Sequence, residues 1–277
     1  MAITNFIPTI WTETLYHELD KKYIAVANSN REFEGDIKEK GASVKICGVG
    51  NITVSDYTKN QDMGAPQELG DMFEELVIDQ AKYFNFQVDD IEKAQSSPKL
   101  MEEAMRKAAS ALANEADKYV FSQVNNSGYL IRMTADVDNI INIIAKSRKM
   151  LYESNVSSDT DVFLEISPAV AELLFLAKAD LGSDNFEVLE NGSIGSIFGC
   201  KVFVSNNIEC NQTSSSSTTY KCMMRTKRSI AFAEQLSEID AYRPEKRFAD
   251  AIKGLYLYGA KVVYPSEVVL LDLTVNI

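Results

Sequence analysis

The stretches SVKICGVGNITVS (43–55) and LVIDQAKYFNFQV (76–88) decide the fold, because both follow a period-two pattern. Their apolar residues of shared parity are Val44, Ile46, Ile52 and Val54 in the first stretch and Leu76, Ile78, Phe84, Phe86 and Val88 in the other. Such alternation indicates strands with one buried face. The polar tip at 58–66 predicts that they form one long hairpin. Gly48 and Gly50 interrupt the first strand, as a bulge or bend would.

A long alanine-rich helix is expected after this hairpin, over 98–124. Ser97 before Pro98 is a typical helix start, and NNSG at 125–128 ends the helix. Its apolar stripe consists of Met101, Met105, Ala108, Leu112, Ala116, Tyr119 and Val120. Such a helix would be roughly 40 Å long. Because a two-stranded ribbon is marginally stable by itself, the hairpin points towards completion by another molecule, and so towards assembly rather than catalysis.

The N-terminal residues predict a short amphipathic helix that begins at Pro8. Its stripe recurs every four residues and contains Ile7, Trp11, Leu15 and Leu19. Docking on the chain's own core and docking as an arm on a neighbouring chain fit this stripe equally well. The segment 28–35 then breaks the periodicity and indicates an extended connector.

The remaining chain is predicted to mix helices and strands. Helices are expected over 137–152 and 168–179, and strands over 162–166, 200–204, 229–233 and 255–265. The apolar run 268–275 is expected to pair with the strand before it. The Ser/Thr-rich segment 211–219 is predicted to be an exposed loop.

Composition narrows the class of protein. The chain has 277 residues, of which 45% are hydrophobic, so it can bury a substantial core. Its net charge of -12 argues against tight nucleic-acid binding. We expect no signal peptide and no membrane span, because no basic n-region or run of about 18 apolar residues occurs. The four cysteines are expected to be free thiols, since a chain of this size needs no disulfide staples.

A search for catalytic chemistry finds no constellation of the required residues. The single histidine, His17, is expected to be an exposed or interface residue, and the cysteine spacings match no zinc pattern. The glycines at 48–50 lack a following helix for phosphate binding, and GSIGS at 192–196 is not a nucleophile elbow. Adjacent carboxylates such as Asp89 and Asp90 point apart and indicate solvated faces. We therefore predict no enzyme, no cofactor and no metal site.

The order of elements resembles the major capsid (coat) protein family of tailed bacteriophages, whose fold herpesvirus capsid floors and encapsulins share. One stretch that carries the resemblance is 28–60, with FEGDI (33–37), KG (40–41), VKI (44–46) and ITVSDY (52–57). The other is RPEKRFADAIKGLYLYGAKV at 243–262. The stretch 28–60 is similar to the start of the family's extended loop. The stretch 243–262 resembles the segment that returns the chain to its peripheral domain.

The resemblance implies an α+β fold, the tailed-phage major capsid protein fold. Residues 1–35 would be an N-terminal arm and 36–90 an extended β-hairpin loop. Residues 91–130 and 241–277 would form the peripheral domain, with the spine helix at 98–124. Residues 131–240 would form the axial domain around the capsomer centre.

The function that the resemblance implies is self-assembly of many copies, as hexamers and pentamers, into the icosahedral head shell that encloses the phage dsDNA genome. The shell would be assembled in the host bacterial cytoplasm and become the virion capsid. A portal protein is implied, as is a separate scaffolding protein, because no long charged helical segment precedes the arm. Packaged DNA would lie inside without sequence-specific binding. Lys59 and Asn276 match no crosslinking motif, so an uncrosslinked shell is favoured.

Candidate intersubunit contacts follow from the same resemblance. They are Trp11, Leu15, Lys59, Met63, Pro66, Arg243, Glu245 and Arg247. Three alternatives stay open: an encapsulin-like nanocompartment shell, a phage tail-tube structural protein, and a hydrolase that uses scattered carboxylates.

Overall fold

The computed structural model describes residues 15, 17–19, 22–32, 43–49, 59, 71–89, 100–157, 159–180, 193–214, 217–236, 239–246 and 248–276. The strands are β1 (Ser43–Val49), β2 (Asp71–Val77), β3 (Gln80–Asp89), β4 (Tyr129–Ala135), β5 (Val162–Ile166), β6 (Ser193–Ile197), β7 (Cys200–Val204), β8 (Cys210–Ser214), β9 (Ser217–Thr226), β10 (Ile230–Leu236), β11 (Asp240–Tyr242), β12 (Ala249–Val262) and β13 (Val268–Asn276). The helices are α3 (Leu100–Ser122), α4 (Ile140–Glu153) and α5 (Pro168–Asp180), with short 3-10 turns η1 (Gln123–Asn126), η2 (Lys227–Ser229) and η3 (Pro265–Glu267). Within these ranges no helix has the length and apolarity needed to cross a bilayer.

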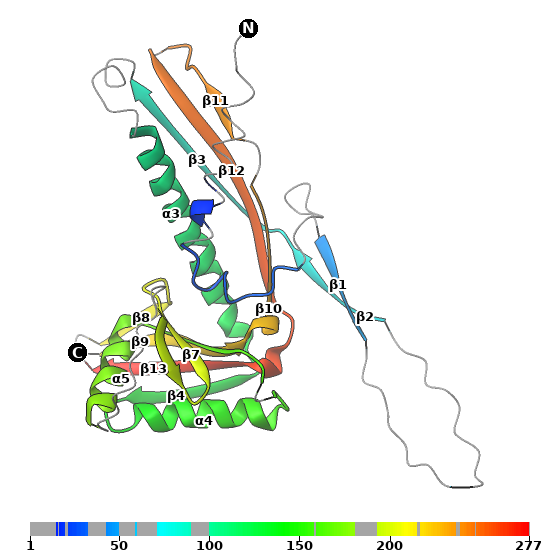
Figure 1. The fold of residues 1–277 in the computed structure, drawn as a ribbon, viewed down its shortest axis with the longest axis vertical. Helices are drawn as coiled ribbons and strands as arrows, with labels where there is room; N and C mark the ends of the chain where they lie inside the picture. The colour runs from blue at the N-terminus through cyan, green and yellow to red at the C-terminus, as the bar shows by residue number, and fades with distance from the viewer. Residues whose placement is uncertain are drawn as a thin grey trace.

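The elongated half of the molecule, here called the spine unit, consists of α3 and a sheet of β3, β10, β11 and β12 (Figure 1). The long strand β12 lies at its centre, with β3 antiparallel on one side and β10 and β11 on the other. The stripe of α3 that packs on this sheet is Met105, Ala109, Leu112, Ala113, Ala116 and Val120. Three of these six residues are alanines, whose small side chains permit a close approach of the helix to the sheet.

The other half, here called the sheet unit, is built on seven strands in the order β4-β13-β9-β5-β7-β6, with β8 paired to β9. Helices α4 and α5 pack against it in one apolar cluster that includes Ile144, Leu174 and Leu271. The predicted helix at 137–152 and strands at 162–166 and 200–204 are confirmed, the helix as α4 with bounds shifted by up to three residues. The two units meet where η1, η2 and η3 lie.

The predicted hairpin is present over its described residues, but at its base the pairing of the second strand ends at Val77 and not at Val88. β1 pairs with β2 from Ser43↔Val77 to Val49↔Asp71 without a shift in register, so the expected bulge at Gly48 is absent. Beyond Val77 the chain leaves β1, and β3 pairs with β12 over ten residue pairs. The reason is that a period-two pattern identifies a half-buried strand and does not identify its partner. The paired strands β1 and β2 are called the ribbon below.

Two C-terminal predictions are also corrected. β13 does not pair with β12 but lies between β4 and β9 in the sheet unit, where all but two of its nine residues are buried. The Ser/Thr-rich segment is not a loop, because β8 and β9 form a hairpin there, with Asn211 opposite Thr219. Thr218 and Thr219 in turn pair with the polar end of β13. Hydroxyl side chains suit such a sheet margin as well as they suit a loop.

Near the N-terminus, Leu15 and Leu19 are fully buried in the core of the spine unit, while His17 is exposed. This packing fits the first alternative for the helix, docking on the chain's own core. Residues 28–30 of the predicted connector are held against the rest of the chain. Asn28 and Ser29 are buried, and Asn30 forms a parallel bridge with Ala231.

Candidate functional site

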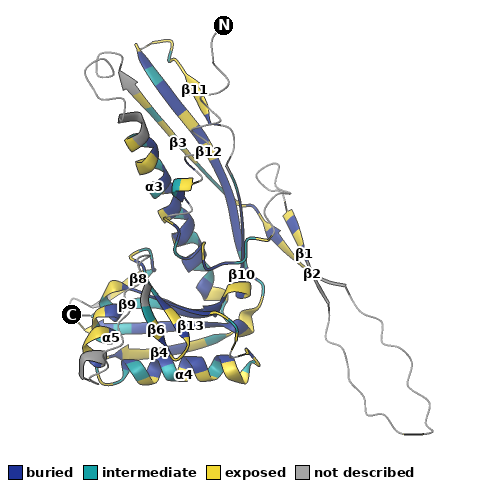
Figure 2. Cartoon of the chain, in the orientation of Figure 1, coloured by how far each residue is buried: buried dark blue, intermediate teal, exposed yellow. Residues whose placement is uncertain are grey.

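The ribbon projects from the side of the spine unit (Figure 1). Its two strands alternate between buried and exposed residues near the base (Figure 2). The buried residues pack on β10 and β12 in one small apolar cluster that contains Val44, Ile46, Leu76, Ile78, Ala231, Ala233 and Leu257. The ribbon is therefore held at its base by methyl groups, through contacts that have little directional preference.

A glycine of β12 sets where the ribbon crosses the sheet. A Cβ added at Gly259 would lie 2.3 Å from the carbonyl oxygen of Val77 and 3.2 Å from the Cα of Ile78. Both are backbone atoms, so the crossing requires glycine at this position. Two strand positions further on, Lys261 Nζ donates a hydrogen bond to the Glu75 carbonyl oxygen at 3.1 Å and forms an ion pair with Glu74.

The spine sheet has one face packed on α3 and one face that no described helix or strand covers beyond the ribbon, here called the open face. On the open face Leu255 lies opposite Tyr83, and Lys253 lies opposite Asn85. Tyr83 is 78% exposed and Leu255 is 40% exposed, which is unusual for large apolar side chains that lie side by side.

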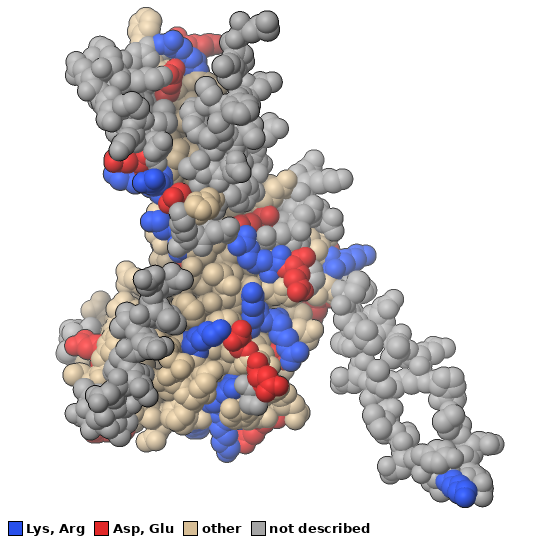
Figure 3. Space-filling view, in the orientation of Figure 1, with Lys and Arg blue, Asp and Glu red and all other residues tan. Residues whose placement is uncertain are grey.

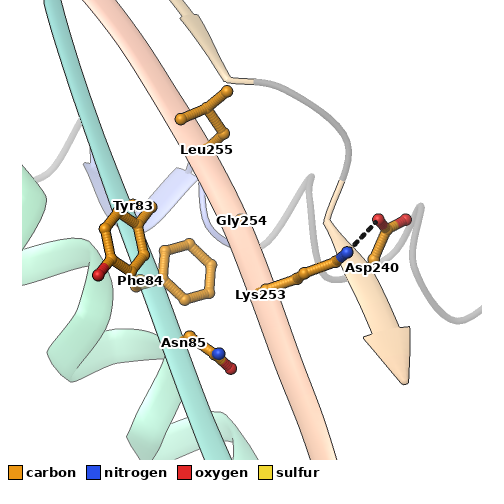
Figure 4. A pocket seen from close by; sticks show the side chains of 7 residues that line it. All are labelled: Tyr83, Phe84, Asn85, Asp240, Lys253, Gly254 and Leu255. Carbon is orange, nitrogen blue, oxygen red and sulfur yellow. Dashed lines mark ion pairs between the residues drawn. The ribbon is translucent and has the colours of Figure 1, made fainter. Parts of the chain in front are cut away.

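A hollow of about 600 Å³ lies between β3, β11 and β12 on this face (Figure 4). Its lining residues are Tyr83, Phe84, Asn85, Asp240, Lys253, Gly254 and Leu255. Lys253 Nζ pairs with the Asp240 carboxylate at 3.5 Å, so the polar side of the hollow is neutral. Asp240 is the one acidic side chain among these lining residues, so the hollow offers no carboxylate pair for acid–base catalysis.

The titratable side chains of the described residues include two buried thiols and a buried tyrosine hydroxyl with raised pKa values. No three His, Cys, Asp or Glu side chains among them lie close enough together to hold a metal ion. Burial raises the pKa of the Cys222 thiol to about 12 and also raises that of Cys200, so both are poor nucleophiles at neutral pH. Burial, helped by the charge of Glu234, raises the pKa of the Tyr256 hydroxyl well above its usual value.

The four predicted contact residues that the structure describes lie in three different places. Lys59 is exposed on the chain between β1 and β2, and Arg243 and Glu245 are exposed between β11 and β12. Leu15 is buried within its own chain. Four others lie outside the described residues, namely Trp11, Met63, Pro66 and Arg247.

Sequence reasoning missed the residues that shape the open face and the crossing. A glycine inside a strand signals a close approach of another backbone, so Gly259 could have been identified from the run LYLYGAKV. That Tyr83 and Leu255 lie side by side could not be predicted, because an alternating pattern does not identify the partner strand.

Several solved structures have a fold similar to that of this chain. No known protein family and no curated protein sequence matches the chain. A solved structure from Mycobacterium phage Che8 is 28% identical, with 90% of each chain covered and a TM-score of 0.70. The capsid structure of the cyanophage P-SCSP1u is 12% identical, with 88% of this chain and 86% of that chain covered and a TM-score of 0.68. A virus-like particle from Pyrococcus furiosus is 14% identical, with 94% and 96% covered and a TM-score of 0.58.

Proposed function

We infer that this chain, which has the tailed-phage major capsid protein fold, is a major capsid protein whose copies assemble into the shell of a phage head. The observation that carries the inference is the match to phage structures over about nine-tenths of both chains.

The geometry supports the same conclusion independently. The ribbon buries its base against its own chain and leaves the rest of its length projecting from the body. A projecting ribbon has unpaired strand edges, which are costly unless another molecule covers them. The open face of the spine sheet offers apolar surface of the kind that such a ribbon would cover. We propose that the ribbon of one copy packs on the open face of the next.

The comparisons favour a phage head over the two structural alternatives. The virus-like particle matches with a lower TM-score and half the sequence identity of the Che8 structure. A tail tube finds no support among the phage capsid structures that match. The matched structures are structural assemblies, and we propose that this chain has no catalytic activity.

The partners belong to the proposal as well. We propose hexamers and pentamers of this chain, a separate scaffolding protein, a portal protein, and assembly in the host bacterial cytoplasm. Basic and acidic side chains are interspersed on the face seen in Figure 3, which fits packaged DNA held without sequence-specific binding.

We propose a domain division that follows the two units of the structure, together with a set of intersubunit contact residues. The spine unit would be the peripheral domain and the sheet unit the axial domain, with β10 counted in the former and β13 in the latter because of their strand pairing. Lys59, Arg243 and Glu245 are proposed intersubunit contacts. The same proposal stands for Trp11, Met63, Pro66 and Arg247.

Electron microscopy of the chain coexpressed with its neighbouring genes tests the function. We expect closed icosahedral particles. Tubes or rings would indicate a tail protein, and a cargo enzyme inside closed particles would indicate a compartment. A species that stays monomeric in light scattering, with the scaffolding protein supplied, would overturn the proposal.

A matched pair of variants on the open face sharpens the test. Tyr83→Asp places a charge on the proposed contact, whereas Tyr83→Phe keeps the ring and removes only the hydroxyl. Because Tyr83 is exposed, both variants should fold. We expect closed particles from Tyr83→Phe and dispersed subunits from Tyr83→Asp. Normal particles from Tyr83→Asp would exclude this face as a contact.

A further inference from the structure

Residues 22–32, here called the strap, run along the boundary between the spine unit and the sheet unit. Along this short segment, contacts to one unit alternate with contacts to the other. The strap also lies between the N-terminal helix and the ribbon in sequence. Its bonds to each unit can be followed residue by residue.

On the spine unit, the strap is held first by α3. The backbone N–H groups of Ile24 and Val26 donate to the two carboxylate oxygens of Asp117, at 3.0 and 3.1 Å. Further along, Asn30 exchanges two backbone hydrogen bonds with β10, at 2.9 and 2.8 Å. Asp117 is fully buried, so these donors replace the water that its carboxylate loses.

A second anchor on the spine unit is Glu234 of β10. Its carboxylate accepts hydrogen bonds from Tyr23 at 2.6 Å and from the Tyr256 hydroxyl, and it pairs with the Arg31 guanidinium at 2.6 Å. Tyr23 and Arg31 belong to the strap, and the Arg31 guanidinium lies 5.8 Å from the centre of the Tyr23 ring. Both ends of the strap therefore meet at one buried carboxylate.

On the sheet unit, the strap is held by a buried ion pair. Arg225 of β9 and Glu165 of β5 form two hydrogen bonds with each other, at 2.9 and 3.0 Å, and both side chains are fully buried. The same guanidinium donates to the backbone carbonyl oxygens of Ala25 at 2.7 Å and Asn28 at 2.8 Å, and to the Ser29 hydroxyl at 3.2 Å. Asn28 returns a hydrogen bond to Glu165 at 3.0 Å.

We propose that the strap is a latch that fixes the orientation of the sheet unit against the spine unit, with the Arg225–Glu165 pair as the anchor that holds it to the sheet unit. The apolar cluster between the units joins Val26, Leu112 and Met223, and such contacts tolerate sliding and rotation. The hydrogen bonds of the strap are directional and charge-assisted, so they select one orientation.

This role has a consequence for the shell, and this part rests on the proposed function. Copies in pentamers and hexamers occupy different environments, so the angle between the two units must be set or adjusted in each copy. A latch that lies between the N-terminal helix and the ribbon would link that angle to both segments. A weakened latch should therefore give shells of more than one size or shape.

The test uses a variant that removes the anchor and leaves the sheet unit folded. Arg225→Met with Glu165→Met replaces the ion pair by apolar groups of similar length, a change that is often neutral for a buried pair. The matched control is Arg132→Met with Asp272→Met, which removes a 2.7 Å ion pair of the same sheet that does not contact the strap.

Two readouts on the free subunit test the latch. We expect the amides of Ile24, Val26 and Asn30 to exchange hydrogen roughly ten- to a hundredfold faster in the anchor variant than in the control. We also expect a broader distance distribution between spin labels at Lys107 of α3 and Lys146 of α4, in a background with Cys47 and Cys210 replaced by serine. An unchanged distance distribution would overturn the latch, even with faster exchange.

A second variant keeps the test decisive if the anchor variant does not fold. Asn28→Ala with Ser29→Ala removes side-chain bonds of the strap and leaves the Arg225–Glu165 pair in place. We expect a smaller broadening in the same direction, and a wild-type distribution would count against the latch. Particles of mixed size from the anchor variant, with uniform particles from the control, would show that the latch also controls the geometry of the shell. If the anchor variant broadens the distance distribution but the wild-type chain forms no particles, the latch is supported and the proposed shell function is rejected.

Discussion

The ribbon base and the strap are both places where a segment crosses the spine unit, and they are fixed by different forces. The ribbon base buries methyl groups of Val44, Ile46 and Leu76, and its close approach is set by a missing side chain at Gly259. The strap buries carboxylates, tyrosine hydroxyls and a guanidinium, each with named partners.

The difference indicates which part of the subunit can adapt. Apolar contacts lose little free energy when a ribbon tilts by a few degrees, whereas a buried charge that loses its partner is costly. A shell protein needs an adaptable contact towards its neighbours and a firm connection within its own body. The ribbon base suits the first need, and the strap suits the second. The predictions below test this contrast, from the largest expected effect to the smallest.

The largest effect is expected from Arg225→Met by itself. The substitution leaves the Glu165 carboxylate buried without its cation and removes one donor each from the carbonyl oxygens of Ala25 and Asn28. We expect a loss of about 3–5 kcal/mol in the free energy of unfolding, measured by urea denaturation. Arg132→Met is the control, because that guanidinium is exposed and its ion pair should contribute less than about 1 kcal/mol. Equal losses in the two variants would remove the distinction between the strap anchor and a surface pair.

The strap should also weaken as the pH rises. Burial raises the pKa of the Asp117 carboxyl to about 7, with the charge of Glu165 adding to the rise and the backbone donors of Ile24 and Val26 opposing it. Because the folded state holds this proton more tightly than the unfolded state, its contribution to stability falls between about pH 4 and pH 7. The fall is at most roughly 4 kcal/mol, at 1.36 kcal/mol per pKa unit.

Asp117→Asn isolates this contribution, because it cannot ionise. We expect the difference in urea midpoint between wild type and variant to change between pH 5 and pH 8, in favour of the variant at the higher pH. A difference that is constant over this range would mean that Asp117 does not titrate there. The ribbon base offers no buried carboxyl in its apolar cluster, so its local exchange should show no matching change.

At the ribbon base, Gly259→Val is expected to displace the ribbon and leave the spine sheet paired. The new side chain would meet the backbone of Val77, and overpacking of this kind costs about 1–3 kcal/mol. Hydrogen exchange should become faster in β1 and β2 and stay slow at the β10–β12 ladder. Microscopy should show fewer closed particles. If exchange instead rises throughout β12, the residue supports the sheet itself and not the crossing.

The sequence predicted these regions where the pattern lies within a short stretch of chain, and failed where the structure depends on residues far apart in sequence. The alternation of Val44 and Ile46 with polar neighbours predicted a strand with one buried face, and the structure confirms it. The partner of β3 was not predictable, because β12 lies more than 150 residues away in sequence. Arg225 and Glu165 were missed for a similar reason. They become neighbours only because β5 and β9 pair, and that pairing cannot be seen in the sequence.

The smallest effect is expected from Lys261→Met, which tests whether any charge helps to orient the ribbon. Lys261 bonds to the Glu75 carbonyl oxygen and pairs with Glu74, but both charged side chains are substantially exposed, so the ion pair should contribute less than about 1 kcal/mol. Global stability should stay within error of wild type. The measurement is the salt dependence of hydrogen exchange in β2: wild type should show a slight increase with salt and the variant none. A loss as large as that of Gly259→Val would mean that directional bonds hold the ribbon as they hold the strap, and the contrast between the two regions would fail.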